Sequence, residues 1–454
     1  MKLKLILSVI ICKVLVLVGK LSGKKGSSTP GQIAMKICPD MLRILSSKVH
    51  NGIICTLGTN GKTTTNNMIN DVIKSTGAKT VCNSIGANML YGVATSFAQG
   101  ASIFGNLNAD WAVIEIDEAT AKIVFEHLTP NYIVITNLFR DQLDRYGEID
   151  MTIDQLKLAI SKAPDATLVL NVDDPLCNYF SYVMNNPVVR FGVNEQVLQP
   201  FNETREGRFC KLCSSELEYE YYHYSQLGKY NCPDCKFTRD NPDYYATEVK
   251  SDGKISFKLN DKFEIHSNTY GFYNLYNILA SVAVSETIGL YIANYTNIFK
   301  EHETQIARME EFDFGKPVIL NLAKNPAGFN QAISAVKNDT RKKAVIIGIN
   351  NMANDGLDVS WLYDVDFEKL DNMCAYGVTG TRKYDMALRL YYSDVCEKPR
   401  IFENAADGAM EFLRTEAEVV YLLLNYSMIF KAEKDLKKKL KLYKREHGIK
   451  EEKI

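Results

Sequence analysis

The sequence predicts an α/β protein of two successive domains, with a small cysteine-rich module inserted in the first. At 454 residues the chain exceeds the usual size of one domain. Short apolar runs typical of buried strands alternate with stretches of helical periodicity, first up to about residue 288 and again beyond Arg308. Such alternation predicts mostly parallel sheets covered by helices on both faces. We expect an apolar helical segment at 1–47, a first domain at 48–305 with the insertion at about 208–240, a Rossmann-like α/β domain at 306–432 and a charged tail at 433–454.

Composition narrows the class of protein. The formal net charge of −1 gives no overall bias toward nucleic acid or acidic membranes. Four of the 11 cysteines form two Cys-x-x-Cys pairs and the rest are scattered singly. This distribution suits the reducing cytosol and one metal site better than a secreted disulfide scaffold.

The first residues form an apolar stretch, Leu3 to Val18, that Lys4 and Lys13 interrupt. A membrane-spanning helix needs about 20 mostly apolar residues, so this stretch is short for one. A secretory signal would require a cleavage site of small residues, and none is clear. We interpret the stretch as a helix packed on the first domain; a helix lying on the inner membrane surface is the alternative.

The first domain opens with a strand at Gly52–Leu57, a glycine loop at Gly58–Thr65 and a helix at Asn66–Thr76. The helix shows apolar residues at helical spacing. Further elements are expected as strands at Trp111–Ile116, Tyr132–Thr136 and Thr167–Asn171 and as a helix at Asn274–Ile288.

The second domain repeats the alternation of strands and helices. The charged end, Lys434–Ile454, is expected as a solvated surface helix. Strands are expected near Val318–Leu322, Ala344–Ile349, Met373–Val378 and Val419–Leu424.

The loop between the first strand and helix has the composition of a phosphate-binding loop. Glycines allow a tight turn whose N–H groups point at phosphate oxygens, and the next helix adds its positive N-terminal end. Lys62 would reach the β- and γ-phosphates, and the Thr63 hydroxyl would bind Mg²⁺. The predicted ATP-binding residues are Gly58, Thr59, Asn60, Gly61, Lys62, Thr63 and Thr64.

Thr56 stands where the general phosphate-binding loop has its first glycine. The shorter loop resembles the Mur ligase and folylpolyglutamate synthase superfamily. By this resemblance Glu115 is a magnesium ligand, and Asn274 and Asn277 belong to an adenine-contacting helix start. Gln142 stands where the family has a metal-binding histidine, which puts a second magnesium site in doubt. The segments Thr136–Asn137, Asp141–Asp144, Asn171–Pro175 and Gly271–Ala280 also match family patterns.

The cysteine cluster predicts a zinc ribbon. The two pairs are Cys210/Cys213 and Cys232/Cys235, with eighteen residues between them. Four thiolates complete a tetrahedral site, so the Zn²⁺ would be structural, and its binding would fold the module. A nucleic-acid-binding ribbon is the rival interpretation; the acidic residues around the cysteines disfavour phosphate contacts.

The second domain and the inserted ribbon resemble the MurT family in particular. The matching segments are Arg308–Glu310, Asn321–Phe329, Asn354–Glu368 and Thr379–Arg382. The early phosphate loop points the same way, because 57 residues leave no room for the preceding domain of ligases that use soluble UDP precursors.

The MurT resemblance implies ATP-dependent amidation of the D-glutamate of lipid II through an acyl phosphate. Arg308 and Arg382 are expected to contact phosphate, although surface salt bridging would also explain them. Asp358 would reach into a partner glutaminase, GatD, that supplies ammonia; capping of a helix at Ser360 is the other interpretation. A ligase adding an amino acid or polyglutamate, and a non-enzymatic P-loop and zinc-ribbon regulatory module, are the alternative functions.

Overall fold

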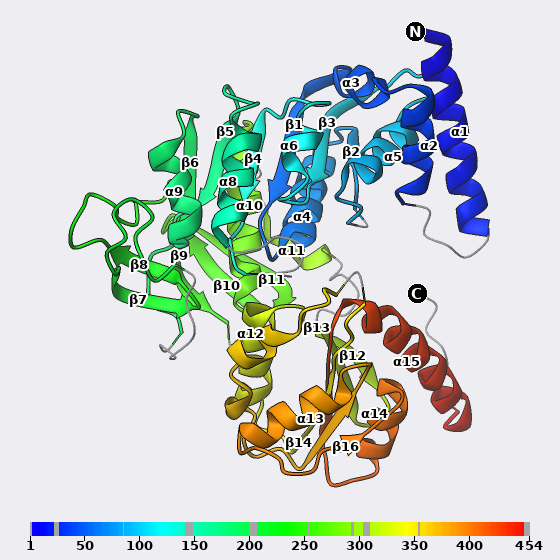
Figure 1. Ribbon diagram of the computed structural model, residues 1–454, viewed down its shortest axis with the longest axis vertical. Coiled ribbons are helices and arrows are strands. Elements are labelled where there is room, and N and C mark those ends of the chain that lie inside the picture. Colours follow the sequence, from blue (N-terminus) through cyan, green and yellow to red (C-terminus); the bar gives the residue numbers. More distant parts are fainter. Residues whose placement is uncertain are drawn as a thin grey trace. The chain divides into compact units, whose positions relative to one another are not determined.

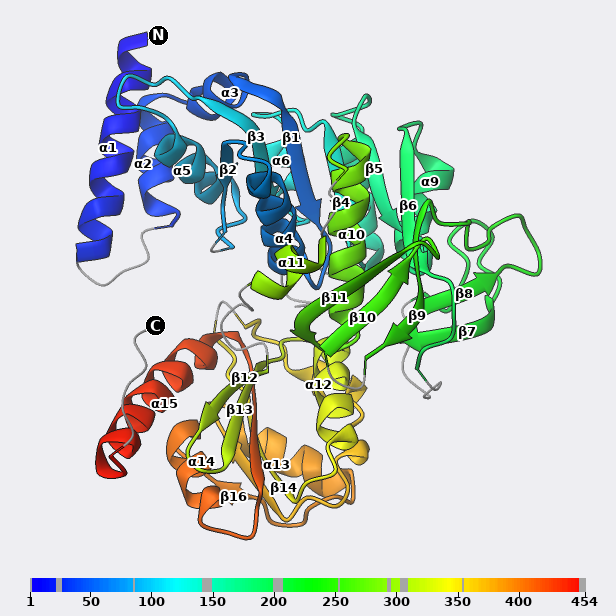
Figure 2. The same ribbon diagram turned by 180° about the vertical axis from the view of Figure 1, so that it is seen from behind.

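A computed structural model of the chain describes residues 2–21, 27–84, 86–140, 149–198, 207–251, 254–291, 295–302, 309–352 and 355–448. The chain divides into two compact units, the first made of residues 1–139 and 148–302 and the second of 140–147 and 303–454. Each unit is an α/β domain, as the sequence predicts (Figures 1 and 2).

Among the described residues, the first unit contains a nine-stranded sheet in the order β11-β10-β9-β6-β5-β4-β1-β3-β2. The strands from β9 to β2 in this order are parallel, and β10 and β11 are antiparallel additions at one edge. The strands are β1 Val49–Leu57, β2 Thr80–Cys82, β3 Ala109–Glu115, β4 Tyr132–Ile135, β5 Thr167–Asn171, β6 Val188–Val193, β9 Tyr244–Lys250, β10 Lys254–Leu259 and β11 Phe263–Tyr270.

Helices cover both faces of this sheet, as predicted. Helices α4 and α10 lie together on one face, and α6, α8 and α9 lie on the other (Figures 1 and 2). The helices are α1 Lys2–Leu21, α2 Thr29–Ile37, α3 Met41–Ser46, α4 Lys62–Ser75, α5 Leu90–Gly100, α6 Ala121–Val124, α8 Ile149–Ile160, α9 Pro175–Val183, α10 Tyr273–Thr287 and α11 Tyr295–Glu301.

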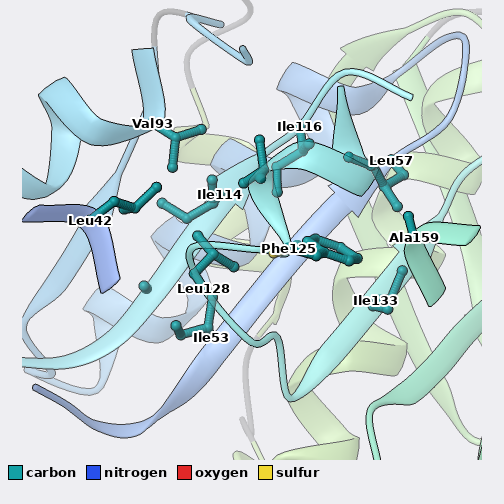
Figure 3. Packing of buried hydrophobic residues seen from close by; sticks show 14 of the residues in the cluster. Leu42, Ile53, Leu57, Val93, Ile114, Ile116, Phe125, Leu128, Ile133 and Ala159 are labelled. Carbon is teal, nitrogen blue, oxygen red and sulfur yellow. The ribbon is translucent and has the colours of Figure 1, made fainter. Parts of the chain in front are cut away.

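The core of this unit follows from strand alternation. Ile53, Cys55 and Leu57 of β1 point to one face of the sheet and join a buried cluster with the helices there. Figure 3 shows Ile53, Leu57 and Ile133 of the strands together with Phe125 and Ala159 from that layer. This packing fixes the carboxyl end of β1, where the phosphate-binding loop begins.

Helix α1 packs on α2 and α5, which agrees with the interpretation of a helix packed on the first domain. Leu5, Val9, Cys12 and Val16 are its buried apolar residues. None of the described helices is long and apolar enough to cross a membrane.

The inserted module contains a two-stranded antiparallel ribbon, β7 Glu218–Tyr224 and β8 Leu227–Asn231. Its own small core includes Leu217, Tyr230 and Phe237 beside the cysteines.

The second unit has a six-stranded sheet among the described residues, in the order β12-β13-β17-β14-β15-β16, parallel except for β12. Its strands are β12 Glu310–Asp313, β13 Pro317–Leu322, β14 Lys343–Gly348, β15 Ala375–Thr379, β16 Arg400–Ile401 and β17 Val419–Leu424. Its helices are α12 Pro326–Asn338, α13 Lys383–Tyr392, α14 Ala405–Leu413 and α15 Tyr426–Glu446, with 3₁₀ turns at Ser360–Asp364 and Phe367–Lys369.

The described part of the charged end is a helix with one solvated face and one buried face. Helix α15 begins at Tyr426, before the charged run, and Leu436 within the run is fully buried. Leu440 and Tyr443 also pack against the core of the second unit. The lysines occupy the outer face of an amphipathic helix, and the density of charged residues in the sequence does not reveal the buried apolar face.

Candidate nucleotide and metal sites

The predicted phosphate-binding loop lies between β1 and α4. Gly58 and Gly61 have φ values of 120° and 81°, which residues with a Cβ rarely adopt. No side chain caps the N-terminus of α4, whose N-cap residue is Gly61. The unpaired N–H groups of a helix's first turn and its dipole favour an anion there. The backbone therefore has the form that phosphate binding requires.

The residues that follow β4 form hydrogen bonds with this loop. The backbone N–H groups of Thr59 and Asn60 donate to the carbonyl and side-chain oxygens of Asn137, at 2.8 and 2.9 Å. The Thr136 hydroxyl donates to the carbonyl oxygen of Asn60 at 2.8 Å. The Thr136-Asn137 pair noted in the sequence thus fixes the conformation of the loop at Thr59 and Asn60.

Lys62 is buried and stays charged. Its Nζ lies 2.9 Å from Oε1 of Glu118 and also donates to the carbonyl oxygen of Gly58. Burial lowers the pKa of Lys62, but the carboxylates of Glu118, Glu115 and Asp117 outweigh burial and raise it above its ordinary value. A positive charge at this position can stabilise phosphoryl oxygens.

Glu118 is a residue that sequence reasoning missed. Its Oε1 also accepts the N–H of Gly58 at 2.7 Å, so one buried carboxylate organises both the lysine and the start of the loop. The only signal was its place just beyond β3, three residues after Glu115.

Thr63 and Glu115 can hold a magnesium ion. Oε2 of Glu115 is buried and accepts no hydrogen bond among the described residues, while Oε1 accepts one from Asn88 at 2.8 Å. A Cβ placed on Gly86 would lie 3.5 Å from Oγ1 of Thr63 and 3.6 Å from Oε2 of Glu115, so both oxygens border the same space. Hydroxyl and carboxylate oxygens are the ligands that Mg²⁺ prefers. The residues fit the ion.

The start of α10 packs on the phosphate loop. Asn277 accepts a hydrogen bond from Thr65 at 3.1 Å and donates one to Asn274 at 2.8 Å. The Cβ position of Gly61 lies 2.2 Å from Oδ1 of Asn277, so a larger residue than glycine would collide there. The two predicted adenine-contacting asparagines thus lie beside the loop, buried at 4% and 3% exposure.

The four ribbon cysteines come together as predicted. Their sulfur atoms all lie within 4.8 Å of one another, with Cys210–Cys235 at 3.6 Å and Cys213–Cys232 at 3.4 Å. A tetrahedral Zn²⁺ with Zn–S bonds of about 2.3 Å needs sulfurs about 3.8 Å apart. The N–H groups of Leu212 and Phe237 point at the sulfurs of Cys210 and Cys235, as suits thiolates. The sulfurs therefore fit one structural zinc.

A buried ion pair, which sequence reasoning missed, joins the ribbon to the sheet and to α10. Nε of Arg239 donates to Oδ1 of Asp173 at 2.7 Å, with the two side chains 4% and 0% exposed. Oδ2 of Asp173 accepts the N–H of Val193 and the hydroxyl of Tyr276, both at 2.8 Å. Tyr276 precedes Asn277, so the ribbon is connected to the helix that borders the phosphate loop.

In the second unit, polar residues gather at the carboxyl ends of the parallel strands. Asn350 after β14 accepts the N–H of Thr381 after β15 at 2.9 Å, and Asn425 after β17 donates to the carbonyl oxygen of Asn350 at 2.7 Å. A cavity of about 460 Å³ opens here, where ligands bind in sheets of this kind. Its lining includes Asn350, Thr381, Lys383, Asn404, Ser427 and Lys431.

Arg382 and Asp358 lie in this unit outside the lining of that cavity. Arg382 faces Asp385 at 3.3 Å, while its Nε is buried without a partner among the described residues. Asp358 is half-buried, and its carboxylate accepts the N–H of Ser360 at 2.7 Å, a bond that lowers the pKa of Asp358. The carboxylate of Asp358 thus satisfies the first N–H of the 3₁₀ turn Ser360–Asp364, whose N-cap position is Val359.

Three segments singled out in the sequence lie outside the described residues. They are Asp141–Asp144 with Gln142, Arg308, and Asn354. The role of Gln142 in metal binding is therefore untested, and the phosphate contact of Arg308 stays a prediction.

Residues 57–235 match the Mur ligase middle domain family, and residues 322–429 match the MurT ligase C-terminal family. The chain is 36% identical over 386 residues to the lipid II isoglutaminyl synthase (glutamine-hydrolyzing) subunit MurT of Staphylococcus aureus strain COL, covering 84% of this chain and 86% of the relative. It is 34% identical over 410 residues to the subunit of that name from Streptococcus pneumoniae strain R6, covering 89% of this chain and 90% of the relative.

Solved structures agree with the fold. A pseudomurein peptide ligase type C from Methanothermus fervidus matches with a TM-score of 0.68 at 19% identity, over 90% of this chain and 85% of that chain. The MurF ligase from Thermotoga maritima in complex with ADP matches with a TM-score of 0.61 at 15% identity, over 90% and 85%. At these identities the likeness establishes the Mur ligase fold and nothing finer.

Proposed function

This chain belongs to the MurT family of Mur-type ligases, and we propose that it is the ATP-dependent synthase subunit that amidates the D-glutamate of lipid II. The α-carboxyl group of that residue in the stem peptide would become the amide of D-isoglutamine. The main support for the proposal is that a single chain contains both a phosphate loop with Lys62 paired to a carboxylate and a second domain of the MurT type.

The chemistry requires activation because a carboxylate is a poor electrophile. A carboxylate oxygen attacks the γ-phosphorus of ATP, ADP leaves, and an acyl phosphate forms. Ammonia then attacks the acyl carbon, phosphate leaves, and the nitrogen loses a proton to give the amide. Lys62 and the N-terminus of α4 would stabilise charge on the transferring phosphoryl group. Magnesium, for which Thr63 and Glu115 are the proposed ligands, supplies further charge neutralisation when bound.

Arg308 and Arg382 are the proposed phosphate contacts from the second domain. The support for Arg382 is its buried Nε, which has no partner among the described residues and is a donor available to a ligand. Substrate-driven closure of two domains is a common way to complete such a site.

Ammonia would come from a separate GatD-like glutaminase. The sequence has no cysteine at a glycine-flanked elbow of the kind that glutaminases use as a nucleophile. Exposed apolar residues that lie close to Asp358 in the sequence support a partner at this part of the second unit, since exposed apolar surface commonly marks protein interfaces. They are Met352, Leu357 and Tyr363, at 50%, 64% and 62% exposure.

The test of the reaction is ATP turnover with lipid II and ammonium chloride, followed by mass spectrometry of the lipid product. The expected product is lighter by the difference between a hydroxyl and an amino group. Lys62→Met should abolish it, whereas Lys74→Met, an exposed lysine on the same helix, should not. ATP turnover without this product would refute the proposal, and free amino acids and glutamate would then be tested as acceptors.

The test of the partner compares ammonium and glutamine as nitrogen sources in the complex with the glutaminase. Asp358→Asn should abolish glutamine-driven amidation and leave ammonium-driven amidation intact. Asp371→Asn, an exposed carboxylate of the same domain, serves as the control. Full glutamine-driven activity of Asp358→Asn would remove Asp358 from the mechanism.

A further inference from the structure

Helix α1 carries apolar residues on two opposite faces. Its inner face, with Leu5, Val9, Cys12 and Val16, is buried against α2 and α5. Its outer face is covered by no other described part of the first unit (Figures 1 and 2). The exposed residues of this outer face are Leu3 at 79%, Leu7 at 48%, Ile10 at 38%, Val14 at 52%, Leu17 at 58%, Val18 at 54% and Leu21 at 81%.

These residues form one continuous stripe. Positions 3, 7, 10, 14, 17 and 21 are separated alternately by four and three residues, the spacing that keeps side chains on one side of a helix. The stripe runs the whole length of α1, from Leu3 to Leu21. Isolated exposed apolar residues are ordinary, but a stripe of this length marks a binding surface.

Lysines border the stripe on both sides. At about 100° per residue, Lys2, Lys13 and Lys20 lie about 80–100° from its centre on one side, and Lys4 lies about as far away on the other. Residues 2–21 contain no aspartate or glutamate. A helix with an apolar stripe and lysine margins is typical of segments that lie in the headgroup region of a bilayer. There the stems of Lys2, Lys4 and Lys20 would reach along the apolar surface while their ammonium groups meet phosphate. Nζ of Lys13 instead donates to the carbonyl oxygen of Gln99 at 2.7 Å.

A neighbouring loop also exposes apolar side chains. The Cβ position of Gly105 lies 3.0 Å from Leu5, so the loop after α5 lies against the first half of α1. Ile103 and Phe104 in this loop are 53% and 64% exposed. Large apolar side chains therefore extend beyond the helix itself.

We propose that the outer face of α1 docks this protein on the surface of a membrane that contains anionic lipids. The apolar stripe would lie at the boundary between headgroups and acyl chains, and Lys2, Lys4 and Lys20 would contact lipid phosphates. A second copy of α1 fits this face less well, because its lysine margins would meet lysines with no acidic partner. The inference rests on α1 and its loop and does not depend on the proposed reaction.

The test is flotation of the full-length protein with vesicles of phosphatidylcholine alone or mixed equally with phosphatidylglycerol. Binding should require phosphatidylglycerol and weaken with salt. Leu7→Gln/Val14→Gln/Leu17→Gln should reduce the bound fraction by about tenfold or more. A matched double variant, Leu158→Gln/Phe263→Gln, removes exposed apolar residues elsewhere in the same unit and should bind like the parent.

A second measurement does not depend on loss of binding. Val14→Trp should show tryptophan quenching by brominated lipids beyond that of the parent protein, since position 14 would contact acyl chains. Absence of vesicle binding, or equal binding of the triple variant and the parent, would overturn the proposal. So would a dimer in light scattering that the triple variant abolishes, because that result would assign the face to a second copy.

Discussion

The buried ion pair between Arg239 and Asp173 predicts that the zinc ribbon stabilises the nucleotide domain. Asp173 is fully buried and accepts hydrogen bonds from Arg239, Val193 and Tyr276. Arg239→Met keeps most of the side-chain volume but leaves a buried carboxylate without its charge partner. Such a loss typically costs about 3–5 kcal/mol. Tyr276→Phe removes only one hydrogen bond to the carboxylate and should cost about 1.5–3 kcal/mol.

The assay is urea unfolding reported by Trp111, which lies on β3 of the first unit. The chain has two tryptophans, so a Trp361→Phe background makes Trp111 the sole reporter. Arg190→Met is the matched control, because Arg190 also faces a ribbon carboxylate, Asp240, but with both side chains 27–28% exposed. A partly exposed pair of this kind should contribute about 1 kcal/mol or less. Equal losses of unfolding free energy in Arg239→Met and Arg190→Met would refute the prediction that the ribbon stabilises the nucleotide domain.

Three further predictions concern metals and pH. Removal of zinc by a strong chelator should lower the Tm of the first domain and leave that of the second unchanged, as differential scanning calorimetry would resolve; a single unshifted transition would contradict a structural zinc. Glu115→Gln should raise the Mg²⁺ concentration for half-maximal ATP turnover by about tenfold or more, because even changes to residues that only support metal ligands weaken metal binding by about tenfold or more. An unchanged Mg²⁺ requirement would show that Glu115 is not a ligand. Burial lowers the pKa of His223 to about 4, so its contribution to stability is present above the unfolded value near 6.5 and is lost as pH falls toward 4. Between pH 7 and pH 4 the free energy of unfolding should therefore fall by about 3 kcal/mol less in His223→Phe than in the parent protein. Parallel plots of unfolding free energy against pH for the two proteins would contradict this.

Local chemistry explains what could be predicted from the sequence. The strand, glycine loop and helix around Lys62 are encoded in consecutive residues, by an apolar run, two glycines and helical spacing. The cluster of four cysteines follows from the spacing of two short motifs. Strands β5 and β17 coincide with their predicted ranges because they are continuous apolar runs buried on both faces.

Long-range pairing explains what could not be predicted. Arg239 and Tyr276 meet Asp173 across 66 and 103 positions of the chain, and nothing near any of the three residues signals the contact. Glu118 looked like one more acidic residue after a strand until β1 and β3 brought it to Lys62. The burial of Leu436 likewise depends on a core formed by distant strands.

The charges of the ribbon help to decide between nucleic-acid binding and a structural role within the first unit. A nucleic-acid-binding module needs basic side chains that are free to neutralise phosphates. Here Arg208, Lys211 and Lys229 pair with Glu216, Asp150 and Glu220, respectively. Arg239 is buried in its ion pair with Asp173. Two rings of the ribbon face the start of α10: the centroid of the His223 ring lies 4.9 Å from that of Phe272, and the centroid of the Tyr224 ring lies 6.3 Å from that of Tyr276. The ribbon therefore directs its strongest interactions toward the helix beside the phosphate loop, which favours a structural role in a ligase over a separate regulatory module.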